Sequence, residues 1–145
     1  MCAAAKRAGI DPVFTRGDNN DLFGAADFGI LCSGTATLEA ALAGLPMVIV
    51  YRGHPLNIFI AKRMVNIDRI GLPNIILGGE TPTFPELIQR DADAASLADR
   101  VITILSAPGE CDRLRDACRE VKARLAGGRT SEAVAEEALR LAARE

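Results

Sequence analysis

Two short apolar runs with a helix-forming segment between them constrain the fold of this chain more than any other feature. The runs FGILC at 28–32 and PMVIVY at 46–51 predict strands, and continuous apolar runs of this kind are typical of parallel strands buried on both faces. Residues 35–43 between them predict a helix that ends at Gly44. Two parallel strands joined by a helix form the repeating unit of open α/β sheets, and the connection in such a unit is right-handed. This stretch therefore predicts an open α/β sheet.

Segments on both sides of this unit continue the alternation of strands and helices. We expect a short strand at 12–15, and the Gly- and Pro-rich stretch at 70–85 predicts an irregular segment. Helices are predicted at 3–8, from Asp18 or Asn19 onward, and at 56–65, 94–105, 108–125 and 130–144. The fold class is therefore α/β: a Rossmann-like, doubly wound, mostly parallel sheet flanked by helices.

The chain length and the last three helices predict a single domain. A domain of 145 residues buries enough surface to form a core without disulfides or metals. Each of the last three helices has one apolar face, so we expect residues 94–145 to pack on the sheet. These faces comprise Leu97, Val101, Ile104 and Leu105; Cys111, Leu114, Cys118, Val121 and Leu125; and Val134, Ala138 and Leu141.

Charge and cysteine content exclude several classes of protein. A net charge of −2 and a pI near 5.5 argue against a nucleic-acid partner. The four cysteines form no CxxC pair or Cys/His cluster, so we expect neither a zinc site nor a disulfide framework, and a reducing cytoplasm fits best. The N-terminus lacks the apolar stretch of a secretory signal, and no run approaches the roughly 20 apolar residues of a spanning helix.

The loop Ser33-Gly34-Thr35 is the first candidate for a binding site. It leaves the carboxyl end of a strand and opens a helix, which is where open α/β sheets bind ligands. Backbone N–H groups and the positive end of the helix dipole would receive a phosphate or diphosphate there. The alternative is that Ser33 or Thr35 only caps the helix.

Glu39 lies one helical turn beyond Thr35 on the same face of the predicted helix. A carboxylate one turn below a bound diphosphate can accept hydrogen bonds from both hydroxyls of a ribose. The two features together favour a nucleotide ligand. The alternative is a solvated helix glutamate.

Four further residues are candidates for ligand contact. Arg52 directly follows the strand at 46–51, and its guanidinium could bind phosphate oxygens with two hydrogen bonds. The others lie in or just after the irregular segment, where polar residues often contact ligands: Asn74, Glu86 and Gln89. His54 is the only histidine, and we assign it no role in proton transfer.

The segment after Pro55 combines apolar and basic residues, so it either packs in the core or contacts a lipid surface. The residues that would contact a membrane or an acyl chain are Leu56, Ile58, Phe59, Lys62 and Arg63. The sequence contains no pair of carboxylates at a catalytic spacing, no Ser-His-Asp set, no Walker lysine and no GxGxxG. We therefore predict no catalytic residue, metal or cofactor in this chain.

The motifs SGTATLE, YRGHP, AKR, GLPN and PELIQ together resemble the C-terminal half of the lipid A disaccharide synthases, and the resemblance covers essentially the whole chain. It implies the UDP-sugar-binding half of an inverting, metal-independent GT-B glycosyltransferase. Such an enzyme transfers 2,3-diacylglucosamine from UDP-2,3-diacylglucosamine to 2,3-diacylglucosamine 1-phosphate (lipid X). The resemblance implies that the UDP-sugar is bound by Ser33, Gly34, Thr35, Glu39, Arg52, Asn74, Glu86 and Gln89.

Family members are more than twice as long, so we expect this chain to be a fragment that lacks the N-terminal acceptor domain and the general base that the domain carries. Alone it should bind UDP weakly and catalyse no transfer. The helix at 130–144 would then lack the N-terminal domain on which it packs. We expect a cytoplasmic protein that contacts the cytoplasmic face of the inner membrane if the segment at 56–63 binds lipid. Homo-oligomerisation stays open.

Two other functions stay open from the sequence. One is a transferase on another UDP-N-acetylglucosamine pathway, although the stretch YRGHPLNIFIAKR argues against it. The other is a non-catalytic UDP-binding module.

Overall fold

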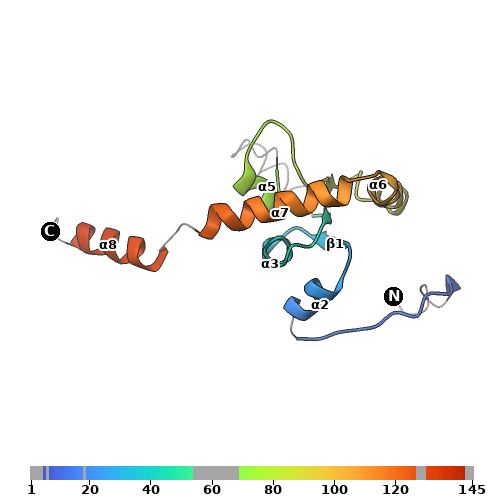
Figure 1. The fold of residues 1–145 in the computed structure, drawn as a ribbon, viewed down its shortest axis with the longest axis horizontal. Helices are drawn as coiled ribbons and strands as arrows, with labels where there is room; N and C mark the ends of the chain where they lie inside the picture. Colours follow the sequence, from blue (N-terminus) through green and yellow to red (C-terminus); the bar gives the residue numbers. More distant parts are fainter. Residues whose placement is uncertain (1–4, 6, 18, 54–68, 127–129, 143–145) are drawn as a thin grey trace.

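The computed structural model describes residues 5, 7–17, 19–53, 69–126 and 130–142. At their centre is a small parallel sheet with helices beside it (Figure 1). The strands are β1 (Gly29–Cys32), β2 (Met47–Tyr51) and β3 (Glu86–Ile88). The helices are α2 (Asn19–Ala25), α3 (Thr35–Ala43), α5 (Leu72–Leu77), α6 (Ala94–Ser106), α7 (Glu110–Ala126) and α8 (Thr130–Ala142).

The three described strands are parallel and lie in the order β1-β2-β3. Cys32 of β1 pairs with Val50 of β2, and Tyr51 of β2 pairs with Ile88 of β3. The carboxyl ends of all three strands therefore lie at one edge of the sheet. This confirms the predicted α/β fold class and the predicted strand–helix–strand unit, whose helix α3 has the expected bounds.

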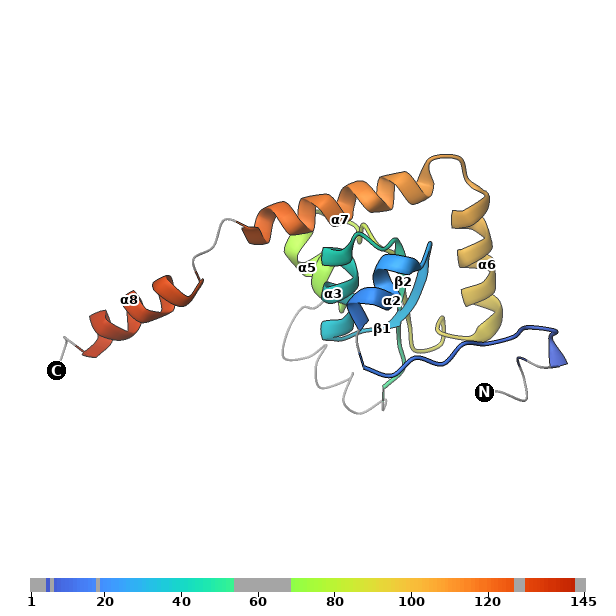
Figure 2. The ribbon, with the colours of Figure 1, turned by 60° about the horizontal axis from the view of Figure 1, so that its bottom comes forward.

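The core lies between β2 and the helices α3 and α7. Met47, Val48 and Ile49 on β2 are fully buried, as are Leu114 and Val121 on α7. Helices α3, α5 and α7 pack against one another, and Figure 2 shows α7 running across the body with α6 turning away at its start. The predicted apolar face of α7 is confirmed except at its end, where Leu125 is exposed. On α6, Ile104 is buried and Leu105 is exposed.

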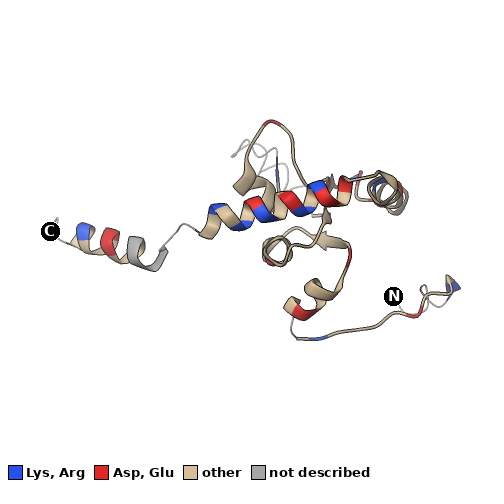
Figure 3. Cartoon of the chain, in the orientation of Figure 1, with Lys and Arg blue, Asp and Glu red and all other residues tan. Residues whose placement is uncertain are grey.

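The outer face of α7 carries acidic and basic side chains in alternation (Figure 3). Ion pairs join residues three or four positions apart, an arrangement that adds a few tenths of a kcal/mol per pair, about 0.2–0.5, to an exposed helix. These pairs are Arg113–Glu110, Arg115–Asp112, Arg119–Asp116 and Arg124–Glu120. Helix α7 is thus apolar toward the core and solvated on its other side.

In the segment 70–88 the structure corrects one prediction and adds a strand that the sequence analysis did not predict. Residues 70–85 are not irregular throughout, because they contain α5, which has a proline in its first turn. A third strand, β3, follows at Glu86–Ile88 and has only three residues. A strand this short shows no period that sequence reasoning could use; its pairing with β2 supports it.

The predicted strand at 12–15 is wrong. Residues 12–15 have no regular secondary structure, and Val13 is 87% exposed and Phe14 is 59% exposed. A strand needs a partner for its backbone hydrogen bonds, and in the described part of the chain this segment pairs with none. It runs outside the body of the domain in Figure 2.

Helix α8 confirms the predicted helix near the C-terminus, but its apolar face does not pack on the sheet. Val134 is 63% exposed and Leu141 is 56% exposed. The helix lies beyond the end of α7, away from the sheet, in both views (Figures 1 and 2). By contrast, α7 packs against α3 and α5, and α6 packs against α7.

Candidate functional site

The candidate site lies at the carboxyl ends of the three described strands. At this edge, loop residues 33–34 follow β1, the described loop residues 52–53 follow β2, and residues 89–93 form the loop after β3. A pocket of about 730 Å³ opens beside the last two loops. Its lining residues are Arg52, Gly53, Ile88, Gln89, Arg90 and Asp91. Sequence reasoning missed Arg90 and Asp91, because only the tertiary structure reveals that β3 ends just before them.

The start of α3 is open to solvent. Gly34 is its N-cap with φ 156° and ψ −168°, a conformation that is essentially restricted to glycine. No side chain caps this helix, and both Gly34 and Thr35 are exposed. The alternative that Ser33 or Thr35 only caps the helix is therefore wrong. The N–H of Thr37 donates to the carbonyl of Gly34 at 3.2 Å, whereas the N–H groups before it have no acceptor within the helix and can bind an anion.

Ser33 is engaged within the protein. Its backbone N–H donates to the carbonyl of Val50 at 2.9 Å, as part of the sheet. Its hydroxyl donates to the carbonyl of Ile70 at 2.7 Å. Since both hydrogens of Ser33 are committed, the donors that the loop offers to a ligand come from Gly34 and Thr35.

Glu39 is exposed on α3, one turn beyond Thr35, as the sequence predicted. Its carboxylate accepts one long hydrogen bond, 3.4 Å from Nδ2 of Asn19 at the start of α2. A contact this long and exposed holds the side chain weakly. The carboxylate is therefore available to a ligand.

Arg52 and Gln89 meet at the pocket, but they differ in what they can do there. Arg52 is exposed and lines the pocket. The side-chain amide of Gln89 accepts from the N–H of Gly53 at 3.0 Å and donates to the carbonyl of Gly53 at 3.0 Å. The Gln89 backbone also donates to the carbonyl of Tyr51 at 2.8 Å. Gln89 thus fixes the backbone directly after Arg52.

Asn74 and Glu86 face the protein interior. Asn74 is 1% exposed; its Nδ2 donates to the carbonyl of Phe84 at 2.8 Å, and its Oδ1 accepts from the N–H of Phe84 at 2.8 Å. The same Nδ2 donates to Oε1 of Glu86 at 2.7 Å. The side chain of Asn74 is thus bonded to its own protein through both of its polar atoms.

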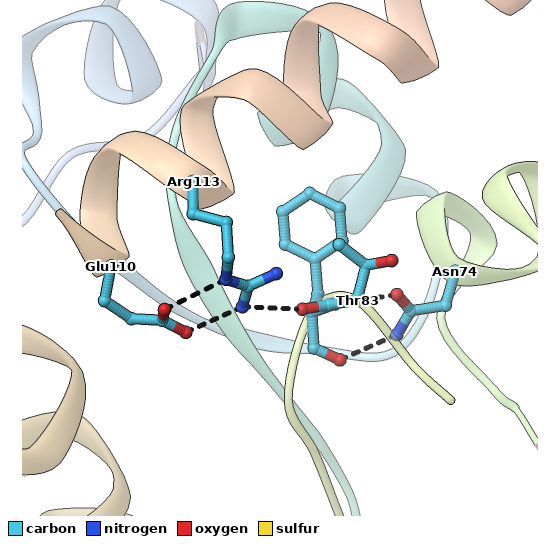
Figure 4. Close-up of polar contacts among 5 residues, drawn as sticks. Asn74, Thr83, Glu110 and Arg113 are labelled. Carbon is cyan, nitrogen blue, oxygen red and sulfur yellow. Dashed lines mark hydrogen bonds and ion pairs between the residues drawn. The ribbon is translucent and has the colours of Figure 1, made fainter. Parts of the chain in front are cut away.

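Two arginines of α7 donate hydrogen bonds to backbone carbonyls of α5 and of the segment between α5 and β3. Arg113 pairs with Glu110 and donates to the carbonyl of Thr83 at 3.2 Å, next to the contact of Asn74 with Phe84 (Figure 4). Arg113 lowers the pKa of Glu110 through this hydrogen-bonded pair, and Glu110 raises the pKa of Arg113. Arg124 donates to the carbonyls of Ile76 and Leu77 at the end of α5.

Several predicted residues lie outside the described part of the chain. These are the candidates for membrane or acyl-chain contact, Leu56, Ile58, Phe59, Lys62 and Arg63, together with His54. In the part that is described, no three His, Cys, Asp or Glu side chains converge in a way that could hold a metal ion. No described helix is both long and apolar enough to cross a membrane.

A parallel sheet flanked by helices, with the carboxyl ends of its described strands at one edge, has the architecture of the Rossmann-like class of α/β domains. A family model described as "Lipid-A-disaccharide synthetase" matches residues 2–140. The chain belongs to this family, whose members are glycosyltransferases of the GT-B type.

Curated relatives agree with this assignment. The chain is 39% identical over 128 residues to a lipid-A-disaccharide synthase of Geobacter sulfurreducens, a match that covers 88% of this chain and 33% of the relative. It is 37% identical over 128 residues to the synthase of Geobacter metallireducens, with the same coverage, and 46% identical over 81 residues to that of a Sulfurihydrogenibium species, covering 56% of this chain and 20% of the relative. The chain thus spans about a third of the length of the first two relatives.

Proposed function

We propose that this chain is the UDP-sugar-binding part of a lipid A disaccharide synthase. The full enzyme would transfer 2,3-diacylglucosamine from UDP-2,3-diacylglucosamine to lipid X, yielding lipid A disaccharide 1-phosphate and UDP. The observation that carries the proposal is the family match over residues 2–140, which includes the uncapped start of α3 at the carboxyl end of β1. An anion-accepting helix end is what a diphosphate leaving group requires.

We assign the binding roles from the geometry of the described residues. The N–H groups of Gly34 and Thr35 would receive the diphosphate, with the positive end of the α3 dipole behind them. Arg52 would donate to phosphate oxygens from the end of β2, and Glu39 would accept hydrogen bonds from the ribose hydroxyls. Ser33, Asn74, Glu86 and Gln89 support these groups, because their polar atoms bind the protein itself.

The chemistry assigned to this part is stabilisation of the departing UDP. The acceptor hydroxyl of lipid X attacks the anomeric carbon, its proton goes to a general base, and the bond from that carbon to the diphosphate oxygen breaks. Negative charge then grows on the diphosphate, where the helix end and Arg52 lie. We assign the general base to the N-terminal acceptor domain of the full enzyme, which is outside this chain. We place the reaction in the cytoplasm at the inner-membrane surface.

Calorimetry tests the nucleotide site directly. The chain should bind UDP saturably, and Glu39→Ala should weaken UDP binding roughly tenfold, since two hydrogen bonds from the ribose to a charged acceptor are lost. Inorganic pyrophosphate, which has no ribose, should bind equally to both proteins. Glu136→Ala, which removes an exposed glutamate of α8, is the matched control and should leave UDP affinity unchanged.

Transfer itself is tested by combining the chain with the N-terminal portion of a relative, UDP-2,3-diacylglucosamine and lipid X. The proposal predicts a disaccharide product. Saturable UDP binding without product would instead favour a non-catalytic UDP-binding module, and absence of UDP binding would refute the nucleotide site.

A further inference from the structure

The peptide group that joins Ile70 to Gly71 lies between Glu86 of β3 and Ser33, which directly follows β1. The carboxylate of Glu86, at the start of β3, accepts from the N–H of Ile70 at 2.9 Å and from the N–H of Gly71 at 3.0 Å. A third donor, Nδ2 of Asn74, reaches the same carboxylate at 2.7 Å. Glu86 therefore receives three hydrogen bonds from the protein, two of them to Oε1.

The other side of this peptide group contacts the loop Ser33-Gly34-Thr35, which we call the anion loop. The carbonyl of Ile70 accepts the hydroxyl of Ser33 at 2.7 Å, and Ser33 directly precedes the N-cap of α3. A continuous chain of hydrogen bonds thus runs from Asn74 through Glu86 and the Ile70–Gly71 peptide to Ser33. It connects the end of β1 with the start of β3.

The packing around Gly71 leaves this peptide little freedom. A Cβ atom at Gly71 would lie 2.4 Å from Cδ1 of Ile49 and 3.0 Å from Oε1 of Glu86. Real Cβ atoms do not approach other atoms as closely as the first of these distances, so a side chain at position 71 would require the end of the buried Ile49 side chain to move. The peptide is therefore held by hydrogen bonds on both sides and by close contact with β2.

We propose that Glu86 is a positioning residue for the anion loop, which acts through the Ile70–Gly71 peptide and Ser33 and does not touch the ligand. The proposal rests on the proposed function, since it concerns the diphosphate site of that function. It replaces the sequence-based expectation that Glu86, Asn74 and Ser33 contact the UDP-sugar themselves.

The electrostatics of the site favour this role. An ionised carboxylate that faced a diphosphate would repel it, and Glu86 lies one hydrogen-bonded peptide away from the loop that would receive that diphosphate. Its carboxylate instead accepts from three N–H groups of the protein, and hydrogen bonds to a charged acceptor are the stronger kind. Glu86 thus directs both of its oxygens to the protein backbone and Asn74, where they hold the loop in place.

Glu86→Gln is the primary test, because it conserves size and changes the hydrogen-bonding pattern. A glutamine has one acceptor oxygen, so its NH₂ group must face at least one of the N–H donors that Glu86 now accepts. In NMR titrations of the full chain, Glu86→Gln should weaken the binding of pyrophosphate and of UDP by the same factor, roughly tenfold. The exposed Glu80→Gln should change neither.

Other patterns of binding would overturn the proposal. Weaker UDP binding with normal pyrophosphate binding would mean that Glu86 contacts the nucleoside. Unchanged binding of both ligands, in a variant that unfolds cooperatively, would mean that Glu86 has no part in holding the loop. A wild-type chain that binds neither ligand would refute the proposed function itself, which is a different outcome from either of these.

Ser33→Ala supplies a second test that does not depend on the folding of Glu86→Gln. If Ser33 holds the loop through Ile70, the amide hydrogens of Ile70 and Gly71 should exchange several-fold faster in ligand-free Ser33→Ala than in wild type. A serine that only donates to phosphate would leave these rates unchanged, and that result would overturn the proposal. Where the double variant folds, the two substitutions should be non-additive in pyrophosphate affinity, whereas independent contacts would add.

Discussion

Replacing Asn74 with alanine tests how firmly the segment between α5 and β3 is attached to the core. The Asn74 side chain is 1% exposed and makes three hydrogen bonds. Two of them pair the backbone N–H and C=O of Phe84, and Phe84 is itself fully buried. The third donates to Glu86, which keeps two backbone donors in the variant.

The expected loss of stability follows from the groups left behind. Alanine leaves the N–H and C=O of Phe84 buried without the partners they have now, and each such group costs about 1–3 kcal/mol. Because two such groups lose their partners, we expect Asn74→Ala to lower the free energy of unfolding by about 2–6 kcal/mol. A small domain has about 5–15 kcal/mol in total, so this is a large fraction of its stability.

Urea denaturation followed by circular dichroism measures this loss. The midpoint should fall while the slope stays unchanged, because the variant exposes similar surface on unfolding. Asn19→Ala removes an exposed side chain with one long hydrogen bond and should change stability by less than about 0.5 kcal/mol. A loss below about 1 kcal/mol for Asn74→Ala would refute the reasoning, because it would mean that water or a rearranged backbone satisfies Phe84.

Three further predictions concern residues of α7. Leu114→Ala removes a fully buried side chain and should lower the free energy of unfolding by about 2–5 kcal/mol in the same urea assay, whereas the exposed Leu125→Ala should have little effect; equal effects would contradict the packing of α7. Burial raises the pKa of the Cys118 thiol from 9.0 to about 11, so at pH 8 a thiol reagent should modify exposed Cys32 much faster than Cys118. Because the unfolded thiol ionises first, the stability that Cys118 contributes is complete below pH 9 and is lost as the pH rises towards 11. Cys118→Ala should show a shallower decrease over that range, and identical curves would contradict the burial of the thiol.

Much of the fold followed from patterns that span few residues. The runs at 28–32 and 46–51 predicted β1 and β2, and the stop signal at Gly44 predicted the end of α3. The spacing of apolar residues predicted α6, α7 and α8. These elements are long or strongly apolar, so the pattern of apolar residues in the sequence matches the residues that the fold buries. The family motifs likewise predicted the membership that the comparison with the family model confirms.

The predictions failed where an element is too short to have a period. Strand β3 has three residues and α5 has six, and both lie in a stretch whose glycines and prolines resemble a loop. Pairing of β3 with β2, and the arginines that α7 directs at α5 and Thr83, support these elements. At 12–15 the error is the reverse, because a strand was predicted where none forms. This segment has no strand beside it among the described residues.

The features of the candidate site also fall into those that the sequence predicted and those that depend on the fold. The sequence by itself determined that a loop opening a helix follows β1 and that Arg52 follows β2, because each of these depends on residues that are neighbours in the chain. Only the tertiary structure decided that Glu86 and Asn74 face inward and bind the Ile70–Gly71 backbone and Phe84. The direction of a polar side chain depends on which unpaired backbone groups the fold brings beside it, and those groups come from residues far away in the sequence.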